Sequence, residues 1–434
     1  MEEWDENAMQ EKMTYMDGDW CPKNFLEMSV PKTKLMLFGP LPRSVPHLTI
    51  RGQPIGLVDS FKYVGMYFQS THRYIFAEHC KQKAKEAIKA LFMSIVTVES
   101  STGDLPPKEM LRVFMARVDP HLIHGCEVAI DVDAPSFKVL ENAQLLGLRR
   151  ILGVSAHSVK APLYTETGII PLAYRRIILA LRYLIYLLGL PPVRLAGAAL
   201  RDSIALLRSE KPGWMSDIKL RLQQLPVPVS LQWSDIETVE GVGAVVKRVE
   251  ESCVEWLRNE IDSNDRALLL RGRFRAGQDI TLHDIVKVRP YLTDIAIPSH
   301  RRAVIRLVFS EHCLAIEQLR RKDRRRLVVP RDLRLCRFCR AAVEDEPHAL
   351  LYCTACPQPL RDRRQALLRL VTNVDRKLDW TSTDLDGYDI LRRLLRSRVL
   401  LPKFGELVYN VLKVFNEFEV YIPDGYYVPD TVMT

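Results

Sequence analysis

The chain has 434 residues, more than one ordinary domain, so we expect two to four units. Hydrophobic residues make up 47% and charged residues 26%, a composition that is typical of folded globular proteins and excludes a largely disordered chain. The formal net charge of +9 is a modest surplus, and by itself it excludes no class of partner.

The first 70 residues predict one helix and a small sheet. Residues 9–22 have helical spacing, whereas residues 34–38 predict a buried strand that ends at a Gly-Pro pair. Residues 47–50 and 61–68 predict two further strands, with turn-forming residues between them. Because helical spacing takes over after about residue 73, we expect strands to be largely confined to residues 30–70.

The remainder of the chain predicts helices, so the expected fold class is α+β, mostly α. The stretch near 191–240 is rich in proline and predicts a linker. Residues 177–190 are apolar, but a membrane span needs about 20 such residues and this run contains Arg182, so we expect a buried helix and no membrane contact. Helices are expected at about 74–96, 108–118, 135–152, 171–190, 243–262, 359–371, 388–399 and 403–417.

The sharpest local motif combines three cysteines with a histidine. Cys336 and Cys339 can both reach one ion from a tight turn, and His348 and Cys353 can complete a tetrahedron from one face of a helix. Three sulfurs and one nitrogen suit Zn²⁺, and four protein ligands leave no open position, so the predicted site is structural. Cys356 forms a second Cys-x-x-Cys pair with Cys353, so an all-cysteine site is the alternative. A third interpretation is a set of buried cysteines without metal.

A strongly basic segment leads into this motif. Between residues 320 and 340 the sequence has ten Lys and Arg against two acids, a concentration of charge that favours a polyanion partner, although such runs are also found on simply solvated faces. Phe338 and Tyr352 offer rings for base stacking or for the small core of the motif. The candidate nucleic-acid contacts are Arg320, Arg321, Lys322, Arg324, Arg325, Arg326, Arg334, Arg337 and Arg340, and Arg331 completes the basic set.

Two segments near the N-terminus resemble non-LTR (LINE-type) retrotransposon reverse transcriptases. Residues 20–34, followed by an apolar strand, resemble the palm segment just after the catalytic Asp-Asp pair. Lys32, Thr33 and Lys34 match the "K-T-K" end of this segment, whereas Pro31 replaces the usual Asn or Ser. Residues 61–66 resemble the hairpin that grips the primer strand in that family. Lys62, Tyr63 and Gly65 match this hairpin, and Val64 replaces the usual Leu.

Further segments follow in the family's order, over about residues 15–420. Residues 73–130 resemble the thumb, residues 140–168 the helical region beyond it, and the cysteine–histidine motif the C-terminal zinc knuckle. The resemblance implies four parts: 1–70, a remnant of the palm with the primer-grip-like hairpin; 71–155, a helical thumb; 156–318, a helical connector with the proline-rich linker; and 319–434, the basic segment, zinc knuckle and C-terminal helices.

The resemblance also sets expectations for chemistry. Polymerases of this family hold Mg²⁺ on palm carboxylates, but this sequence contains no adjacent Asp-Asp pair, so we expect no catalytic residues, no polymerase activity and Mg²⁺ only in the intact parent enzyme. The expected product is a truncated, intracellular (nuclear or cytoplasmic) protein that binds Zn²⁺, RNA and DNA, specifically the retroelement transcript and its target DNA.

Two other functions remain open at this point. The chain is alternatively a subunit that completes a polymerase with a separate N-terminal piece, or a zinc-stabilised helical scaffold for protein interactions. The sequence predicts no oligomeric state and no nucleic-acid sequence preference.

Overall fold

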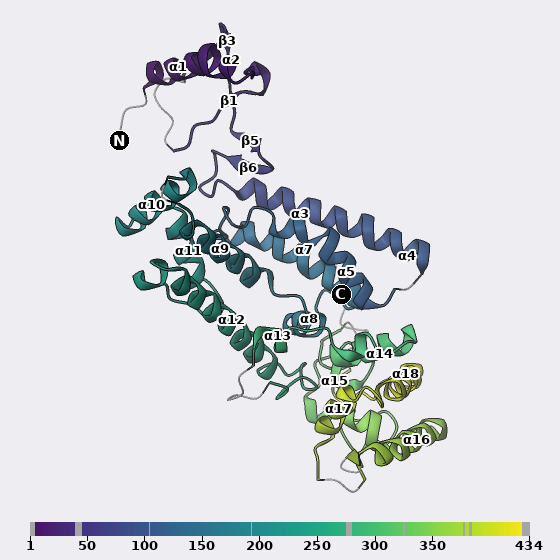
Figure 1. The fold of residues 1–434 in the computed structure, drawn as a ribbon. Coiled ribbons are helices and arrows are strands. Elements are labelled where there is room, and N and C mark those ends of the chain that lie inside the picture. The colour runs from purple at the N-terminus through teal and green to yellow at the C-terminus, as the bar shows by residue number, and fades with distance from the viewer. Residues whose placement is uncertain are drawn as a thin grey trace. The chain divides into compact units, whose positions relative to one another are not determined.

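The computed structural model describes residues 5–39, 46–103, 105–191, 193–274, 280–323, 326–375, 378–381 and 384–427. It divides into two compact units, one made of residues 1–86 and 131–140, the other of residues 87–130 and 141–434. Helices dominate, and among the described residues the named strands all lie between 34 and 69, which confirms the mostly α prediction (Figure 1). The finer division predicted for residues 71–434 stays a prediction.

A helical segment opens the first unit and is fixed to a strand by side-chain hydrogen bonds. The amide nitrogen of Gln10 donates to the carbonyl of Thr49, and the N–H of Thr49 donates back to Gln10, both at 2.9 Å. Gln10 therefore fills the hydrogen-bonding role of a neighbouring strand. The guanidinium of Arg51 holds Asp17 and Glu27, at 2.7 and 2.5 Å. The helical segment comprises α1 (Glu6–Tyr15), the π-helical turn η1 (Met16–Trp20) and α2 (Cys21–Lys23).

Three separate two-stranded pairs follow. The buried strand expected at 34–38 is wrong in extent and in burial: only Lys34 and Leu35 are paired, neither is buried, and Phe38 is 53% exposed. The reason is that the partner strand is equally short and is itself exposed. The pairs are β1 (Lys34–Leu35) with β4 (Gly56–Leu57), parallel; β2 (Thr49–Ile50) with β3 (Gln53–Pro54), antiparallel; and β5 (Ser60–Tyr63) with β6 (Met66–Gln69), antiparallel.

The β5–β6 hairpin turns through two residues. Tyr63 pairs with Met66, which leaves Val64 and Gly65 as the loop, with φ of 47° and 83°. Positive φ at both positions is what a type I′ turn requires, and its twist matches that of the strands. Glycine adopts this conformation freely, but a β-branched valine does so at a cost.

The second unit is a stack of helices around an apolar core. In α9 (Leu172–Leu188), the expected buried helix, Ile177, Leu181 and Leu184 are buried, and it packs on α12 (Val239–Asp262) through the stacked rings of Tyr174 and Trp256, 5.7 Å apart. Helices α3 (Ala77–Leu91) and α7 (Ala134–Leu152) belong to this unit from residues 87 and 141 onward. The other helices up to residue 285 are η3 (Phe92–Val96), α4 (Thr97–Thr102), α5 (Pro107–Arg117), α6 (Asp119–Ile123), α8 (Lys160–Thr167), η4 (Trp233–Ile236) and α13 (Leu282–Ile285).

The proline-rich stretch near 191–240 is not a linker. It folds into α10 (Leu195–Arg208) and α11 (Trp214–Gln223), which pack on each other and on α9. Leu200 and Ile218 are buried in these contacts. Pro191, Pro212, Pro226 and Pro228 lie outside both helices, where they remove no helical hydrogen bond, so proline content misled the prediction.

No described helix combines the length and the apolar character that a membrane crossing needs.

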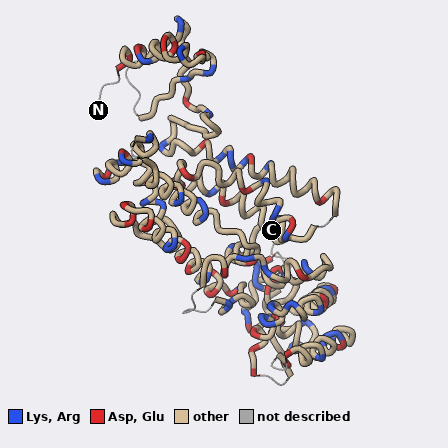
Figure 2. Tube along the Cα trace, in the orientation of Figure 1, with Lys and Arg blue, Asp and Glu red and all other residues tan. Residues whose placement is uncertain are grey.

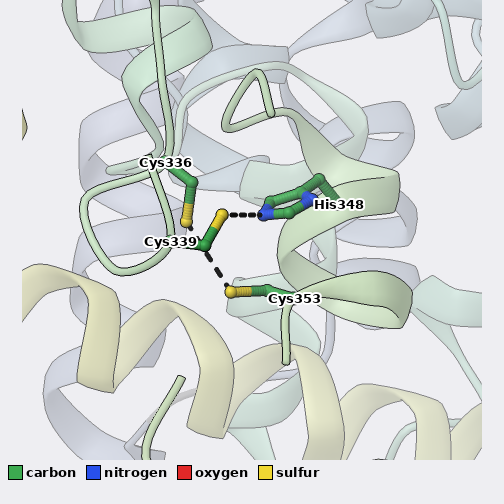
Figure 3. Close-up of side chains that lie close together, drawn as sticks. All are labelled: Cys336, Cys339, His348 and Cys353. Carbon is green, nitrogen blue, oxygen red and sulfur yellow. Dashed lines mark hydrogen bonds between the residues drawn. The ribbon is translucent and has the colours of Figure 1, made fainter. Parts of the chain in front are cut away.

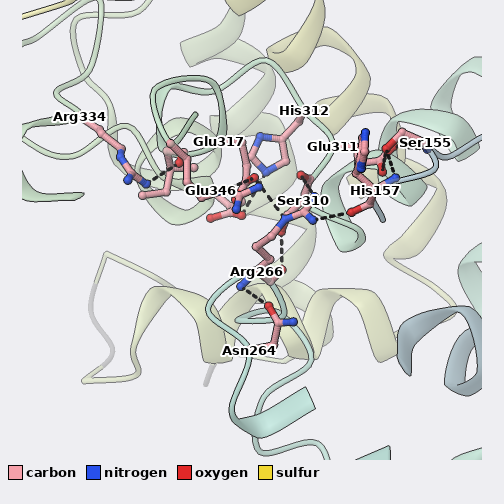
Figure 4. Close-up of polar contacts among 12 residues, drawn as sticks. Ser155, His157, Asn264, Arg266, Ser310, Glu311, His312, Glu317, Arg334 and Glu346 are labelled. Carbon is pink, nitrogen blue, oxygen red and sulfur yellow. Dashed lines mark hydrogen bonds and ion pairs between the residues drawn. The ribbon is translucent and has the colours of Figure 1, made fainter. Parts of the chain in front are cut away.

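A polar network fixes the loop after α14 (Pro298–Val308) to distant parts of the second unit (Figure 4). The guanidinium of Arg266 donates to the carbonyl of His157 at 2.8 Å and to that of Ser310 at 3.2 Å. The carboxylate of Glu311 accepts from the N–H and the hydroxyl of Ser155, at 2.8 and 2.7 Å. These bonds hold the segment that leads into the region of the cysteine–histidine motif.

That region contains the remaining helices. Helix α14 packs along α18, and α16 and α17 pack on α18 as well. The predicted helices at 359–371, 388–399 and 403–417 are therefore confirmed, whereas α14 was not predicted. The elements are η5 (Pro290–Leu292), α15 (Ala315–Gln318), η6 (Arg331–Leu333), η7 (His348–Tyr352), α16 (Gln358–Val374), α17 (Gly387–Arg396) and α18 (Leu401–Glu417).

Candidate metal centre

Cys336 and Cys339 lie in a tight turn at the end of a small backbone hairpin. The N–H of Cys336 donates to the carbonyl of Ala342 at 2.8 Å, and the N–H of Arg340 donates to the carbonyl of Cys336 at 2.9 Å. An isolated antiparallel bridge closes the hairpin one residue further out. Arg340 has a φ of 54°, the left-handed conformation that lets the chain reverse within so few residues. The turn presents two thiols to one point.

His348 and Cys353 come from a single π-helical turn. The N–H of Cys353 donates to the carbonyl of His348 at 2.9 Å, which is the i to i+5 bond of this wide helix. Residues five apart thereby lie one above the other, as ligands for a common ion require. Asp345 secures the start of the turn, because its carboxylate accepts from the N–H of His348 at 2.9 Å.

The four ligand atoms converge (Figure 3). The sulfurs of Cys336 and Cys353 are 3.7 Å apart, the sulfur of Cys339 is 3.3 Å from Nε2 of His348, and all four atoms lie within 4.8 Å of one another. Ligands at about 2.0–2.3 Å around a tetrahedral ion are separated by about 3.3–3.8 Å. The cluster can therefore hold a metal ion such as zinc. Within the described part of the chain, no other group of His, Cys, Asp and Glu meets this criterion.

The contact between two of the sulfurs shifts the pKa values of both cysteines. The hydrogen-bond contact between the sulfurs of Cys336 and Cys353 lowers the pKa of Cys336 and raises that of Cys353. Both cysteines are buried, whereas Cys339 and His348 are partly exposed. A buried thiolate needs a compensating cation, and a bound metal ion supplies one.

Cys356 lies outside this cluster. Its thiol donates to the carbonyl of Cys353 at 3.2 Å, and its sulfur is 3.6 Å from the guanidinium of Arg364. The pKa of Cys356 is lowered to about 6, first by the hydrogen-bond contact with the side chain of Cys353 and then by the charge of Arg364. Of the two ligand sets, the geometry favours the one with His348 over the all-cysteine set.

Arg364 also supports the π-helical turn from behind. It projects from α16, is buried, and donates to the carbonyls of Leu350 at 2.9 Å and Cys353 at 2.6 Å. Carbonyls at the end of a helical turn have no partner within it, and a cation there satisfies them and complements their dipoles. Arg364 was not predicted from the sequence as part of the site.

Arg337, a predicted nucleic-acid contact, is used internally. Its guanidinium binds Glu344, which is 0% exposed, at 2.6 Å, and its own side chain is 3% exposed. It also donates to three backbone carbonyls, that of Phe415, that of Phe418 at 2.6 Å and that of Cys313 at 2.7 Å. Arg337 thus connects the cysteine turn to the C-terminal end of α18.

The rest of the basic segment divides into internal and exposed residues. Arg334 is buried and donates to the carbonyls of Val329 and Ile316 at 2.9 and 2.8 Å. Arg320 pairs with Glu317 at 3.1 Å, and Arg326 pairs with Asp323. Arg324 and Arg325 lie outside the described residues. The exposed members are Arg321, Lys322, Arg331 and Arg340.

The two aromatic candidates also differ. The ring of Phe338 meets those of Phe415 and Phe418 edge to face, at 4.9 and 5.1 Å, so it packs against α18. The side chain of Tyr352 is 40% exposed. Packing within the core therefore fits Phe338, whereas Tyr352 is the more exposed of the two rings.

The residues matched to the palm motif and the primer grip lie in the first unit. The hydroxyl of Thr33 donates to the carbonyl of Ser29 at 2.9 Å, and the Lys62 ammonium lies 4.9 Å from the centre of the Tyr67 ring. Their roles stay predictions. Lys32 ends the short helix η2 (Val30–Lys32), Thr33 follows it, Lys34 begins β1, Lys62 and Tyr63 end β5, and Gly65 lies in the hairpin turn.

A buried set of hydrogen-bonded polar side chains near the cysteine–histidine cluster was not predicted from the sequence. Nε2 of His312 contacts the carboxylate of Glu346 at 3.1 Å, and the hydroxyl of Tyr388 donates to the same carboxylate at 2.8 Å. Burial alone raises the pKa of Glu346, but the bonds with His312 and Tyr388 outweigh it and the pKa lies below its usual range. The run of three acids at 344–346, within so basic a region, was the available signal.

No protein-family model matches this chain, and no curated protein and no solved structure is significantly similar to it.

Proposed function

We propose that Cys336, Cys339, His348 and Cys353 bind one structural Zn²⁺. The donor set and the 3.7 and 3.3 Å separations support a tetrahedral site, and this geometry carries the proposal. Four protein ligands leave no position for a reacting water, so the ion would fix the hairpin to the π-helical turn and would not hydrolyse a substrate.

The second part of the proposal is that this zinc-stabilised region binds RNA and DNA, as in the non-LTR reverse transcriptases that the sequence resembles. Its support is the order of the matched segments and the local surplus of positive charge. Arg321, Lys322, Arg331 and Arg340 are exposed and suit phosphate contacts, whereas Arg334 and Arg337 are engaged internally. Retroelement RNA and its target DNA are the partners that the resemblance implies.

A protein-interaction scaffold is the second candidate, and one observation favours it. Every arginine near the cysteine turn whose side chain is buried, Arg334, Arg337 and Arg364, bonds to backbone carbonyls and holds helices in place. An arrangement of this kind needs no nucleic acid. Binding measurements decide between the two.

The experiment combines metal analysis with nucleic-acid binding by the full chain. We expect about one zinc per protein, retained by Cys356→Ser and lost by Cys339→Ser. The wild-type protein should bind RNA or single-stranded DNA with an affinity that falls as salt rises, because phosphate contacts release counterions. A metal-loaded protein that binds neither nucleic acid at low salt would exclude this function and leave the scaffold. Loss of zinc from Cys356→Ser would contradict the ligand set.

A further inference from the structure

A polar groove lies between α14 and α18 in the second unit. It has a volume of about 530 Å³, and the loop at residues 311–313 forms its floor. Pockets of about 300–1,000 Å³ accommodate small ligands or a short stretch of a polymer, but not the full width of a nucleic-acid duplex. Its polar and charged lining includes Ser299, Arg302, Arg306, Glu311, His312, Gln318, Lys413 and Asn416.

Positive charge dominates this groove. Arg302 and Arg306 stand one turn apart on α14, and Lys413 faces them from α18; all three are exposed. Glu311 is the acid among the lining residues, and Ser155 already binds both of its oxygens, at 2.8 and 2.7 Å. The lining therefore holds three cationic side chains against one carboxylate, a composition that favours an anion (Figure 2 marks Lys and Arg along the chain in blue).

A neighbouring hollow on the other side of Gln318 shows the opposite balance. It measures about 450 Å³, and its lining includes the acids Asp323, Glu417 and Glu419. Its arginines, Arg326 and Arg337, are paired with carboxylates. A polyanion would be repelled there, so charge complementarity selects the groove between α14 and α18.

Hydrogen bonds within the protein hold the floor of the groove, the loop at residues 311–313, in place. The thiol of Cys313 donates to the carbonyl of Leu412 at 3.2 Å, and Arg337 donates to the carbonyl of Cys313 at 2.7 Å. His312 is fixed through Nε2 by Glu346, yet its Nδ1 has no hydrogen-bond partner among the described residues although the side chain is 0% exposed. An unsatisfied buried polar atom beside a groove is a common mark of a site completed by a ligand or water.

One wall of the groove also carries an aromatic ring. Tyr409 lines it and is half-buried, and its ring packs 5.1 Å from that of His300. Phosphate-binding cations beside an aromatic face are the combination with which proteins hold single strands, because every base has a face that stacks. Ser299, Gln318 and Asn416 add hydrogen-bonding groups for phosphate or sugar oxygens.

We infer that this groove binds the sugar-phosphate backbone of single-stranded nucleic acid, with Arg302, Arg306 and Lys413 as its phosphate contacts. The inference rests on the proposed nucleic-acid-binding function and moves its main contact surface away from the basic segment at 320–340. It also explains how a zinc ion that touches no nucleic acid would matter: Arg337, within the cysteine turn, positions both the floor and the end of α18.

The test compares triple variants that remove the same charge. The groove variant is Arg302→Gln/Arg306→Gln/Lys413→Gln, the basic-segment variant is Arg321→Gln/Lys322→Gln/Arg331→Gln, and the control is Lys211→Gln/Lys219→Gln/Lys247→Gln, at exposed lysines elsewhere in the second unit. Binding of fluorescent oligo(U) RNA and oligo(dT) DNA is measured over a range of salt concentrations, together with zinc content and the unfolding temperature.

We expect the groove variant to lose about tenfold or more in affinity for one or both strands, and its plot of log K against log salt to become less steep by about 2, since each single-strand contact contributes about 0.7. Zinc content and unfolding temperature should be unchanged, and Arg302→Lys/Arg306→Lys should keep binding. The control should bind as the wild type does.

Two results would overturn the inference while leaving the proposed function intact: loss in the basic-segment variant with wild-type binding by the groove variant, or equal losses in the groove variant and the control. Absence of binding by the wild-type protein would instead defeat the proposed function. The two failures are therefore distinguishable.

Discussion

Individual residues illustrate why positive charge in a sequence does not by itself identify a binding surface. Arg337 and Arg340 are three positions apart in one basic segment, yet Arg337 is buried against Glu344 while Arg340 is exposed and lies 4.7 Å from the centre of the Tyr421 ring. The difference depends on which way each side chain leaves the cysteine turn, and linear spacing in an irregular turn does not encode that direction.

A residue-scale prediction follows from the Arg337–Glu344 pair. Arg337→Gln removes the cation from a carboxylate that is 0% exposed and leaves several carbonyls without their donor. We expect the free energy of unfolding of the second unit to fall by about 3–5 kcal/mol, because an uncompensated buried charge is costly.

The matched control is Arg331→Gln, at an exposed position of the same segment, which should change stability by no more than about 0.5 kcal/mol. Urea unfolding followed by circular dichroism measures both. Equal stability of the two variants would show that Glu344 finds another partner.

At the scale of elements, helical periodicity predicted the positions of several helices well, whereas the apolar run at residues 34–38 did not predict the length or burial of its strand. The helices expected at 135–152 and 243–262 appear at Ala134–Leu152 and Val239–Asp262, because their apolar faces are long enough to define a period. The expected strand at 34–38 shrank to two residues, because strand length depends on a partner that the local sequence does not specify.

The metal cluster shows a similar division. Its four ligands were predictable from spacing, since Cys-x-x-Cys and a later His and Cys imply convergence. The sequence also favoured His348 over Cys356 as the fourth ligand, but the π-helical turn that places His348 above Cys353 was not predicted. A helical turn of this width has no signature in the residues that form it.

The β5–β6 turn carries an element-scale prediction. Val64 is 80% exposed, so its side chain contributes little packing, and its φ of 47° is unfavourable for a β-branched residue. Val64→Asn should stabilise the hairpin by about 1 kcal/mol, because Asn tolerates the left-handed conformation and suits a type I′ turn.

Gly65→Ala should act in the opposite direction, since φ is 83° there. Hydrogen exchange of the β5 and β6 amides reads out both changes. Slower exchange in Val64→Asn and faster exchange in Gly65→Ala are expected, and the reverse order would mean that the turn has another geometry.

A second element-scale prediction concerns Glu166 in α8. Its buried carboxylate contacts Arg273 at 2.5 Å, Arg289 at 3.6 Å and the hydroxyl of Tyr291 at 2.9 Å. These contacts join α8 to residues on both sides of α13. Burial alone raises the pKa of Glu166, but Arg273 and Arg289 outweigh it, so the pKa lies below the usual value of 4.5.

A lowered pKa in the folded state means that the carboxylate stabilises the fold above about pH 4.5 and that this contribution is lost as the pH falls through the folded-state pKa. Glu166→Gln should therefore cost about 3 kcal/mol at pH 7, and the difference from the wild type should shrink in acid. Urea unfolding between pH 7 and pH 3 tests this, and a difference that grows as pH falls would contradict it.

At the scale of the whole molecule, the two units differ in how much apolar surface they bury. In the first, Phe25 is 98% exposed and Tyr63 is 64% exposed, and Leu48 and Ile50 are among the few buried apolar side chains. In the second, helices from α5 to α18 contribute buried apolar side chains. Composition predicted a folded chain, but it could not show that burial is so unevenly distributed. A composition averaged over 434 residues does not say where the apolar residues lie along the chain.

This uneven distribution leads to a prediction about metal removal. The hairpin and the π-helical turn around the cluster are short, and small motifs of this kind have too little core to stay ordered without their ion. The α9–α12 core, by contrast, is held by aromatic and aliphatic packing, with Tyr174 stacked on Trp256. Loss of zinc should therefore unfold one region and leave the other intact.

We expect chelation of zinc from the full chain to increase hydrogen exchange in residues 334–353 first, and then in the loop at 311–313 and the end of α18, because Arg337 connects the cysteine turn to both. Exchange in α9 and α12 should stay at its original rate. Arg337→Gln loaded with zinc separates the two steps: it should lose protection at 311–313 while residues 348–353 stay protected. An equal increase in exchange across the second unit after chelation would mean that the metal supports the whole core. Unchanged exchange at residues 334–353 would mean that this segment does not need the ion to stay folded.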